Sequence, residues 1–299
     1  MSKASVSYKS RGKEKKSSME RSLREEIGPL PRIVLYVLLL GFTFLTLYPL
    51  IWMAINSFKT TQEFLLNPLG LPNRWFAKNY SLAWRLANFS TLFLNSILYT
   101  GISTIGVIWF SLAAAFAFAK IKSRFTPFLY GGFLIGILFT IESLMIPLYL
   151  MAFTTGLVNT RVGVLIPYIG LGLPLGIYLC TEFIKGLPDS VIEAGRIDGA
   201  SYLKIFIYII IPMAKPVIAT VAILNGLGIW NEFMLINILV SRGNLLSLPV
   251  GIMKFSGALA SDYGKQFAAL VIGTVPTVTF YLVLRNRITQ GVAVGATKG

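Results

Sequence analysis

The sequence predicts an all-α integral membrane protein with six transmembrane helices and a short cytoplasmic helix between the fourth and the fifth. The chain of 299 residues is 55% hydrophobic and only 13% charged, and its mean hydropathy is +0.71. A soluble protein carries about 25% charged residues, so this composition indicates a membrane protein. Six apolar runs are also long enough to cross a hydrocarbon core of about 30 Å, which requires roughly 20 helical residues.

The predicted spans follow the apolar runs between charged residues. They cover residues 33–55, 94–118, 127–151, 162–181 and 209–230, and the sixth lies between Lys265 and Arg285. If the N-terminus is cytoplasmic, the inner segments hold 18 Lys and Arg residues and the outer segments hold eight. Because basic residues collect on the cytoplasmic side, this distribution predicts that both termini are cytoplasmic.

The distribution of charged and apolar residues divides the chain into three regions. Residues 1–31 are rich in Lys, Ser and Glu and lack apolar periodicity, which predicts a disordered, positively charged cytoplasmic tail. Specific binding to anionic lipid is the alternative for this tail, and nucleic acid is not expected as a partner. The transmembrane domain is predicted over residues 32–286, and a short flexible C-terminal tail over residues 287–299.

A polar stretch, residues 187–216, separates the fourth and fifth spans. Ser190 precedes Glu193 by three residues, which is the spacing of a capping box at a helix start. Gly199 offers a C-terminal stop, and Ser201 offers a second start. The stretch is therefore predicted to form a compact helix–turn–helix on the cytoplasmic side, where a partner outside the lipid can contact it.

Five residues are candidates for a substrate pathway. They are Glu142, Asn225, Trp230, Asn231 and Glu232. An acid at membrane depth costs about 2.5–3.5 kcal/mol, so Glu142 should line a cavity or bond a neighbouring helix. Polar side chains beside a tryptophan suit carbohydrate hydroxyls, but they also suit an ordinary interfacial cap, which the physics favours.

The residue inventory argues against an enzyme or an ATP-binding chain. The absence of histidine largely excludes zinc sites and histidine acid–base catalysis, so no catalytic or metal-binding residue is predicted. Residues 257–265 end in Gly-Lys, but six residues separate the two glycines where a phosphate-binding loop has four. If transport is active, a separate subunit must hydrolyse ATP.

Other classes of function remain as alternatives. A secondary transporter would also place polar residues at membrane depth, but it would more often show internal repeats, and no convincing repeat is found. A membrane-embedded enzyme would need clustered catalytic side chains. A scaffold role would explain the cytoplasmic stretch but not the features of the outer loops and the fifth span.

The cytoplasmic stretch resembles the EAA motif of ABC importer permeases, in which Glu-Ala-Ala is followed at fixed spacing by glycine, isoleucine and Leu-Pro. The matching residues are Glu193, Ala194, Gly199, Ile209 and Pro212. Two positions depart from the motif, because Gly195 replaces the second alanine and Ile211 replaces the leucine.

Further short motifs resemble the carbohydrate-uptake branch of this family. They are Ser57-Phe58-Lys59, Asn79-Tyr80, Asn95-Ser96, Leu157-Val158-Asn159-Thr160, Asp198-Gly199-Ala200-Ser201, Trp230-Asn231-Glu232-Phe233 and Gly295-Ala296-Thr297-Lys298-Gly299. The resemblance covers about residues 57–299 and is closest to the shorter, six-span permease subunit of maltose-type importers.

The resemblance implies a permease subunit of an ATP-driven, binding-protein-dependent sugar importer in the bacterial cytoplasmic (inner) membrane. The implied partners are a second permease subunit, a dimer of ATPase subunits, an extracytoplasmic sugar-binding protein and the lipid bilayer. ATP and Mg²⁺ would be bound by the ATPase subunits and no cofactor by this chain. In maltose-type systems the principal sugar contacts lie in the partner permease.

The resemblance also implies that residues 182–208 form a coupling loop whose helix docks on the ATPase. Glu193 would make polar contacts there, Ala194 and Gly195 would allow close approach, and Gly199 would form the turn. The short helix would continue rigidly into the fifth span. The implied coupling residues are Glu193, Ala194, Gly195, Asp198, Gly199, Ala200, Ile209 and Pro212.

Overall fold

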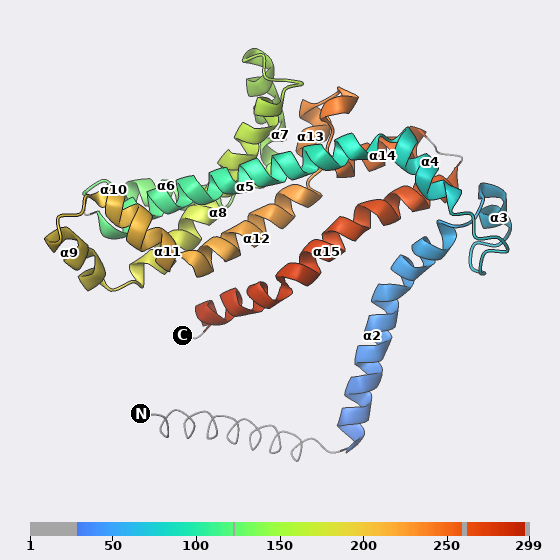
Figure 1. Ribbon diagram of the computed structural model, residues 1–299, viewed down its shortest axis with the longest axis horizontal. Coiled ribbons are helices and arrows are strands. Elements are labelled where there is room, and N and C mark those ends of the chain that lie inside the picture. Colours follow the sequence, from blue (N-terminus) through green and yellow to red (C-terminus); the bar gives the residue numbers. More distant parts are fainter. Residues whose placement is uncertain (1–28, 122, 259–261, 297–299) are drawn as a thin grey trace. The chain divides into compact units, whose positions relative to one another are not determined.

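The computed structural model describes residues 29–121, 123–258 and 262–296, and every regular element in these residues is helical (Figure 1). The chain divides into two units, one ending at Ile55 and one beginning at Asn56. Helix α2 (Pro29–Asn56) belongs to the first unit. The second unit contains α3 (Thr61–Leu66), α4 (Lys78–Leu86), α5 (Phe89–Lys120), α6 (Thr126–Gly136), α7 (Ile141–Thr154), α8 (Arg161–Lys185), α9 (Asp189–Ile197), α10 (Tyr202–Ile205), the π-helix η1 (Phe206–Ile210), α11 (Ile211–Met213), α12 (Lys215–Asn231), α13 (Met234–Leu239), the 3₁₀ turn η2 (Gly243–Leu245), α14 (Leu248–Ala258) and α15 (Tyr263–Ala296).

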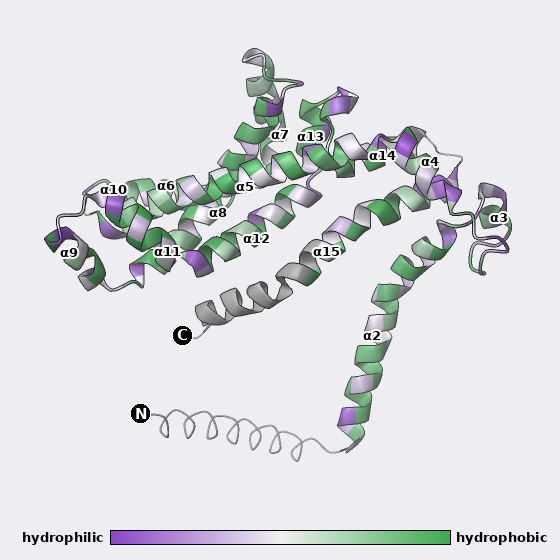
Figure 2. Cartoon of the chain, in the orientation of Figure 1, coloured by the Kyte–Doolittle hydropathy of each residue, from purple (hydrophilic) through white to green (hydrophobic). Residues whose placement is uncertain are grey.

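Helix α2 carries the first predicted span. Most of its apolar side chains are exposed, and Figure 2 shows hydrophobic residues along nearly the whole helix. The Thr43 and Thr46 hydroxyls donate to the carbonyls of Leu39 and Phe42, four residues earlier, at 2.7 and 2.8 Å. Because these hydroxyls are satisfied within the helix, α2 can face lipid without leaving them unpaired.

Three helices in the described residues are long and apolar enough to cross a membrane, or up to five if each of two bent helix pairs is one span. The three are α2, α5 and α8, which contain the first, second and fourth predicted spans. The sixth predicted span lies within α15, which continues without a break through Ala296. No change of secondary structure therefore marks the predicted start of the C-terminal tail at residue 287, and the predicted N-terminal tail lies mostly outside the described residues.

The third predicted span is not a single straight helix. Helices α6 and α7 meet at an angle of 102° across residues 137–140. The N–H groups of Ile137 and Leu138 bond carbonyls three residues earlier, at 3.1 and 3.0 Å, so the helix tightens and ends there. Thr140 is extended and starts α7, which places Glu142 in a first turn rather than at the middle of a span.

The fifth predicted span is also broken, so the predicted cytoplasmic helix does not continue straight into it. Residues 202–213 and 215–231 meet at 75° around Ala214. Pro212 has no N–H for the carbonyl four residues earlier, and the N–H of Ile211 bonds the Phe206 carbonyl at π-helical spacing. Pro216 likewise cannot donate to the Pro212 carbonyl and disfavours helical backbone at Lys215, so the two prolines together account for the break.

The long helices α5, α8 and α12 pack against one another (Figure 1). Glycine permits this approach, because a Cβ atom added at Gly176 of α8 would overlap the Ser111 hydroxyl of α5. Two buried apolar clusters lie along these helices. One includes Trp230 with residues of α13 and α14, and the other includes Phe116 with residues of α10 and η1. The second cluster supports the loop between α8 and α12 that carries the candidate site.

Candidate functional site

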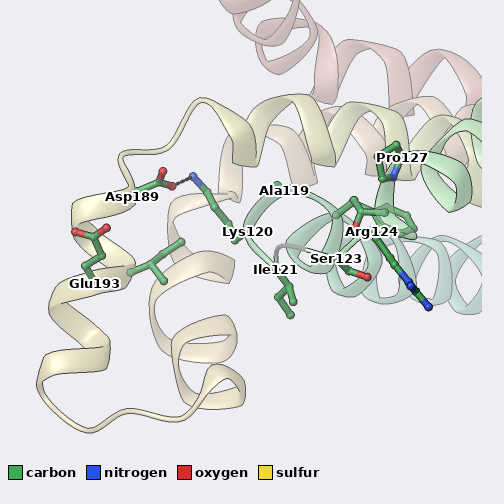
Figure 3. A pocket seen from close by; sticks show the side chains of 11 residues that line it. Ala119, Lys120, Ile121, Ser123, Arg124, Pro127, Asp189 and Glu193 are labelled. Carbon is green, nitrogen blue, oxygen red and sulfur yellow. Dashed lines mark hydrogen bonds and ion pairs between the residues drawn. The ribbon is translucent and has the colours of Figure 1, made fainter.

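Helix α9, the end of α5 and the start of α6 line an open cleft of about 630 Å³ (Figure 3). The cleft is lined by Phe118, Ala119, Lys120, Ile121, Ser123, Arg124, Thr126, Pro127, Asp189, Ile192 and Glu193. Figure 3 shows Lys120 and Asp189 pointing toward each other, with Glu193 one turn further along α9. The predicted cytoplasmic helix is therefore one wall of this cleft.

The predicted capping box at the start of α9 is wrong. The helix begins at Asp189, its N-cap residue is Pro188, and no side chain caps its N-terminus. Ser190 consequently lies inside the first turn, where its hydroxyl does not act as the N-cap. The Asp189 carboxylate lies in that turn and interacts favourably with the helix dipole.

The predicted stop at Gly199 is confirmed. Gly199 has φ of +76°, a left-handed conformation that favours glycine. The Ala200 N–H donates to the Gly195 carbonyl at 2.9 Å, and the Gly199 N–H donates to the Arg196 carbonyl at 3.1 Å. These two bonds form a Schellman motif, which satisfies the last carbonyls of α9 and turns the chain sharply.

Replacing Gly199 with alanine should weaken this turn by about 1 kcal/mol, because a Cβ atom is unfavourable in the left-handed region. Amide hydrogen exchange should then be about fivefold faster for residues 195–200. Gly228→Ala is the control, since Gly228 lies within α12 with open space around it and no left-handed backbone. Equal exchange in wild type and Gly199→Ala would contradict the role of the turn.

The predicted second start at Ser201 is also confirmed. The Ser201 hydroxyl accepts from the Lys204 N–H at 3.4 Å and caps α10. Helix α10 and η1 then pack on the C-terminal half of α5. The Phe206 ring lies 5.7 Å from Phe116 and 5.9 Å from Trp109, measured between ring centroids.

Ala194 faces the exterior of the protein, whereas Gly195 faces its interior. Gly195 is buried, and a Cβ atom there would lie 3.1 Å from Ile209 Cδ1 and 3.3 Å from Ile205 Cγ1. The glycine thus allows α9 to lie against the second half of its own loop. This contact explains why the motif places an isoleucine at position 209, fourteen residues after the small residue.

The exposed surface of α9 and its C-cap residue carries acidic side chains, one arginine (Arg196) and apolar side chains. Glu193, Ala194 and Asp198 are exposed, whereas Ala200 is half-buried. Sequence reasoning missed Ile197, whose side chain is 86% exposed on the same short helix. The sequence did contain a signal for this exposed residue, because a large apolar side chain stands inside the polar motif between Glu193 and Gly199. Pro212 is exposed and Ile209 half-buried, and both serve the turn and packing of the loop.

Sequence reasoning also missed Lys120, the last residue of α5. Its Nζ donates to the Leu187 carbonyl at 2.8 Å and to the Asp189 carboxylate at 2.6 Å. The Lys120 side chain is 6% exposed, whereas that of Asp189 is 77% exposed. No local pattern signals this contact, because its partners lie 67 and 69 residues away along the chain.

The candidate substrate residues do not share one element. Glu142 is exposed in the first turn of α7, whereas the other four belong to α12 and the residue that follows it. The Asn225 amide donates to the Val221 carbonyl at 3.2 Å and the Asn231 amide to the Leu227 carbonyl at 2.9 Å, both within α12.

Trp230 and Glu232 have structural partners. Trp230 is buried and lies 5.8 Å from the Phe93 ring in an edge-on arrangement. The Tyr168 hydroxyl donates to one Glu232 carboxylate oxygen at 2.5 Å, and the Leu235 N–H donates to the other at 2.7 Å. These contacts favour the interpretation of this segment as a helix cap that holds α13.

Two of the other short motifs tie loops at the opposite end of the helices, whereas residues 297–299 of the C-terminal motif lie outside the described residues. Asn95 donates to the carbonyls of Asn244 and Leu246 at 2.9 and 3.0 Å. Asn159, with φ of 61°, accepts from the N–H groups of Ser241 and Arg242 at 2.7 and 3.1 Å. Each asparagine therefore fixes a loop by backbone hydrogen bonds rather than offering a free polar group.

Lys59 and Asn79 form a comparable tie after α2. The buried Lys59 ammonium donates to the Asn67 carbonyl at 2.7 Å, and the Asn79 amide donates to the Ser57 and Lys59 carbonyls. Burial lowers the pKa of Lys59, and the neighbouring Glu63 carboxylate opposes this shift. The motif lysine thus holds a loop in place.

The comparison with known families identifies the class of protein. Residues 30–292 match the family described as "Binding-protein-dependent transport system inner membrane component". The chain belongs to this family. The prediction of an ABC importer permease in the inner membrane is confirmed, as is the prediction that the chain is not itself an enzyme.

Several curated relatives match over most of their length. The diacetylchitobiose uptake system permease protein of Streptomyces coelicolor is 33% identical, covering 87% of each chain. The multiple sugar-binding transport system permease protein of Streptococcus mutans is 34% identical, covering 88% of this chain and 96% of the relative. The trehalose transport system permease protein of Mycobacterium tuberculosis is 31% identical, with 89% and 96% covered.

A solved structure has the same fold. It is the crystal structure of a bacterial ABC transporter involved in the import of the acidic polysaccharide alginate. The TM-score is 0.75 at 25% sequence identity, and the match covers 87% of this chain and 98% of the matched chain.

Proposed function

We propose that this chain is one of two permease subunits in an ATP-driven importer of carbohydrates. The single observation that carries the coupling role is the exposed exterior of α9, where Glu193, Asp198 and Ile197 surround a small residue, Ala194. In a permease of this family, such a surface suits a soluble partner. The Gly199 turn satisfies the last carbonyls of α9 and fixes where this surface ends.

The carbohydrate substrate is supported by the names of the relatives, which include transporters for diacetylchitobiose, trehalose and multiple sugars. Within this chain, Asn225, Asn231 and Glu142 remain candidates for sugar contact. Trp230 and Glu232 are weaker candidates, because their side chains already have partners inside the protein. An extracytoplasmic sugar-binding protein would deliver the substrate to the loops tied by Asn95 and Asn159.

The proposed topology has six spans with both termini in the cytoplasm. The basic residues support it, because 18 fall in inner and eight in outer segments. The α6–α7 and α10–α12 pairs would each be one broken span, and α15 would be the sixth. Bends of this kind are tolerated where neighbouring helices or a water-lined route cover the freed backbone groups.

ATP and Mg²⁺ would be bound by a separate pair of ATPase subunits, and this chain would bind no cofactor. Closure of the ATPase pair around ATP would move α9 and alternate access to the translocation route. Such a change is a shift between two states that bind nucleotide with different affinity. Glu193 and Asp198 would make polar contacts with the ATPase, and Ala194 would permit close approach.

Copurification of an ATPase subunit tests this proposal. Glu193→Ala should weaken recovery of the ATPase about tenfold or more, since a hydrogen bond to a charged group contributes about 1.5–3 kcal/mol. The measurement is ATPase recovered and ATP hydrolysed after purification of the tagged full chain in detergent. Glu142→Ala is the matched control for ATPase recovery, because Glu142 is also an exposed carboxylate in the first turn of a helix but lies in α7.

Two results would overturn the proposal. If the wild-type chain recovers no ATPase, energy coupling through α9 fails and a secondary transporter becomes the better explanation. If Glu193→Ala and Glu142→Ala recover as much ATPase as wild type, the acidic exterior of α9 is not the docking surface.

A further inference from the structure

We infer that Lys120 is a positioning residue that locks the coupling helix α9 to α5, so that α5 rather than α12 transmits the motion of α9. This inference rests on the proposed function, because it concerns how α9 is held for the ATPase. It assigns a role to a residue outside the coupling motif and names the route that the motion takes.

The contacts of Lys120 carry the first step. Its side chain is only 6% exposed although it ends a 32-residue helix. A buried ammonium requires polar partners, and Lys120 finds them in the Leu187 carbonyl and the Asp189 carboxylate. Leu187 and Asp189 flank the N-cap of α9, so one ammonium fixes both the direction and the start of that helix (Figure 3).

The other end of the loop is fixed to the same helix. Phe206 of η1 packs on Phe116 and Trp109 of α5, and Phe116 also lies 6.4 Å from the Tyr202 ring. Gly195 in turn holds α9 against Ile205 and Ile209. Both ends of the loop are thus attached to the last turns of α5, and α9 lies between these attachments.

The connection to α12 is mechanically weaker. It passes through the π-helix η1 and the bend of 75° around Ala214, and Pro212 and Pro216 each remove one regular backbone hydrogen bond along it. Helix α5 is continuous from Lys120 to Phe89, and at its far end Asn95 and Tyr99 hold the segment around Leu245. A displacement of α9 can therefore reach the opposite side of the membrane through one unbroken helix.

Distances between spin labels test this route in the full chain, purified with its ATPase and placed in lipid nanodiscs. One label replaces the exposed Ser190 in α9, and the second replaces Ile105 in α5 or Leu224 in α12, both exposed. The buried Cys180 is replaced by alanine. Each pair is measured without nucleotide and after trapping with ATP and vanadate.

The expected result is a narrow Ser190–Ile105 distance that is the same in both states, and a Ser190–Leu224 distance that changes between them. Lys120→Met should broaden the Ser190–Ile105 distribution, and Lys120→Arg should restore it. Lys185→Met is the control, since the Lys185–Glu182 ion pair lies within one helix at 2.8 Å. That control should leave both distributions unchanged.

The inference is overturned if the Ser190–Ile105 distance shifts on trapping, or if the Ser190–Leu224 distance stays constant. It is also overturned if Lys120→Met leaves the nucleotide-free distribution as narrow as wild type. Failure of the proposed function is a separate result, because no ATPase would then copurify, while the nucleotide-free comparison still reports whether Lys120 holds α9.

Discussion

Gly176→Leu should separate α5 from α8 and lower the free energy of unfolding by about 1–3 kcal/mol, the usual cost of overpacking a well-packed interior. Gly176 is buried, and a Cβ atom there would overlap the Ser111 hydroxyl and lie 3.1 Å from both Ser111 Cβ and Val107 Cγ1. The remaining atoms of a leucine have no space on this face. Both helices would have to move apart, since α5 packs more extensively on α8 than on any other element.

Gly170→Leu is the matched control for this change. Gly170 lies in the same helix, is exposed, and has open space where a Cβ atom would lie. The measurement is unfolding of the purified chain in mixed micelles, followed by helical content and by the yield of folded protein. If both variants unfold like wild type, the close approach at Gly176 does not stabilise the helix pair.

The straight spans could be predicted from sequence because hydropathy and charge are local properties. Helices α2, α5 and α8 each fill an apolar run bounded by charged residues, and α2 and α8 continue through their internal prolines, Pro49, Pro167 and Pro174. The bends in the third and fifth spans were harder to predict from the sequence. In the third span the break at residues 137–140 falls in an apolar stretch, and the polar pair Glu142 and Ser143 just after it does not by itself indicate a bend of 102°. In the fifth span Pro212 signalled the break, but not its angle of 75°.

The candidate site likewise contains features that the sequence could predict and features that it could not. Gly199 and Ser201 could be recognised because a turn and a cap are set by residues within four positions of them. The predicted capping box failed because Pro188 took the N-cap, a choice between neighbouring starts that spacing does not decide. The contacts of Lys120 could not be predicted because its partners lie far away along the chain. The hydrogen bond between Tyr168 and Glu232 could not be predicted for the same reason, since 64 residues separate the two.

Gly195→Leu should detach α9 from the rest of its loop and abolish recovery of the ATPase. The added side chain would meet Ile205 and Ile209, whose nearest atoms already lie 3.1–3.3 Å from the position of a Cβ. Relief requires α9 to move away from α10 and η1, at a cost of about 1–3 kcal/mol. Amide exchange in residues 189–200 should therefore accelerate together with the loss of the ATPase.

Two neighbouring changes separate this effect from a direct block of docking. Gly195→Ala restores the alanine of the motif, and the lower backbone entropy of alanine, worth roughly 0.5–1 kcal/mol, offsets the tight contact with Ile209. This variant should bind the ATPase like wild type. Ala194→Leu adds the same bulk to the exposed exterior of α9, so it should reduce ATPase recovery while amide exchange stays unchanged. Gly195 holds the helix and Ala194 meets the partner, and a reversal of the two exchange results would show that α9 is oriented the other way.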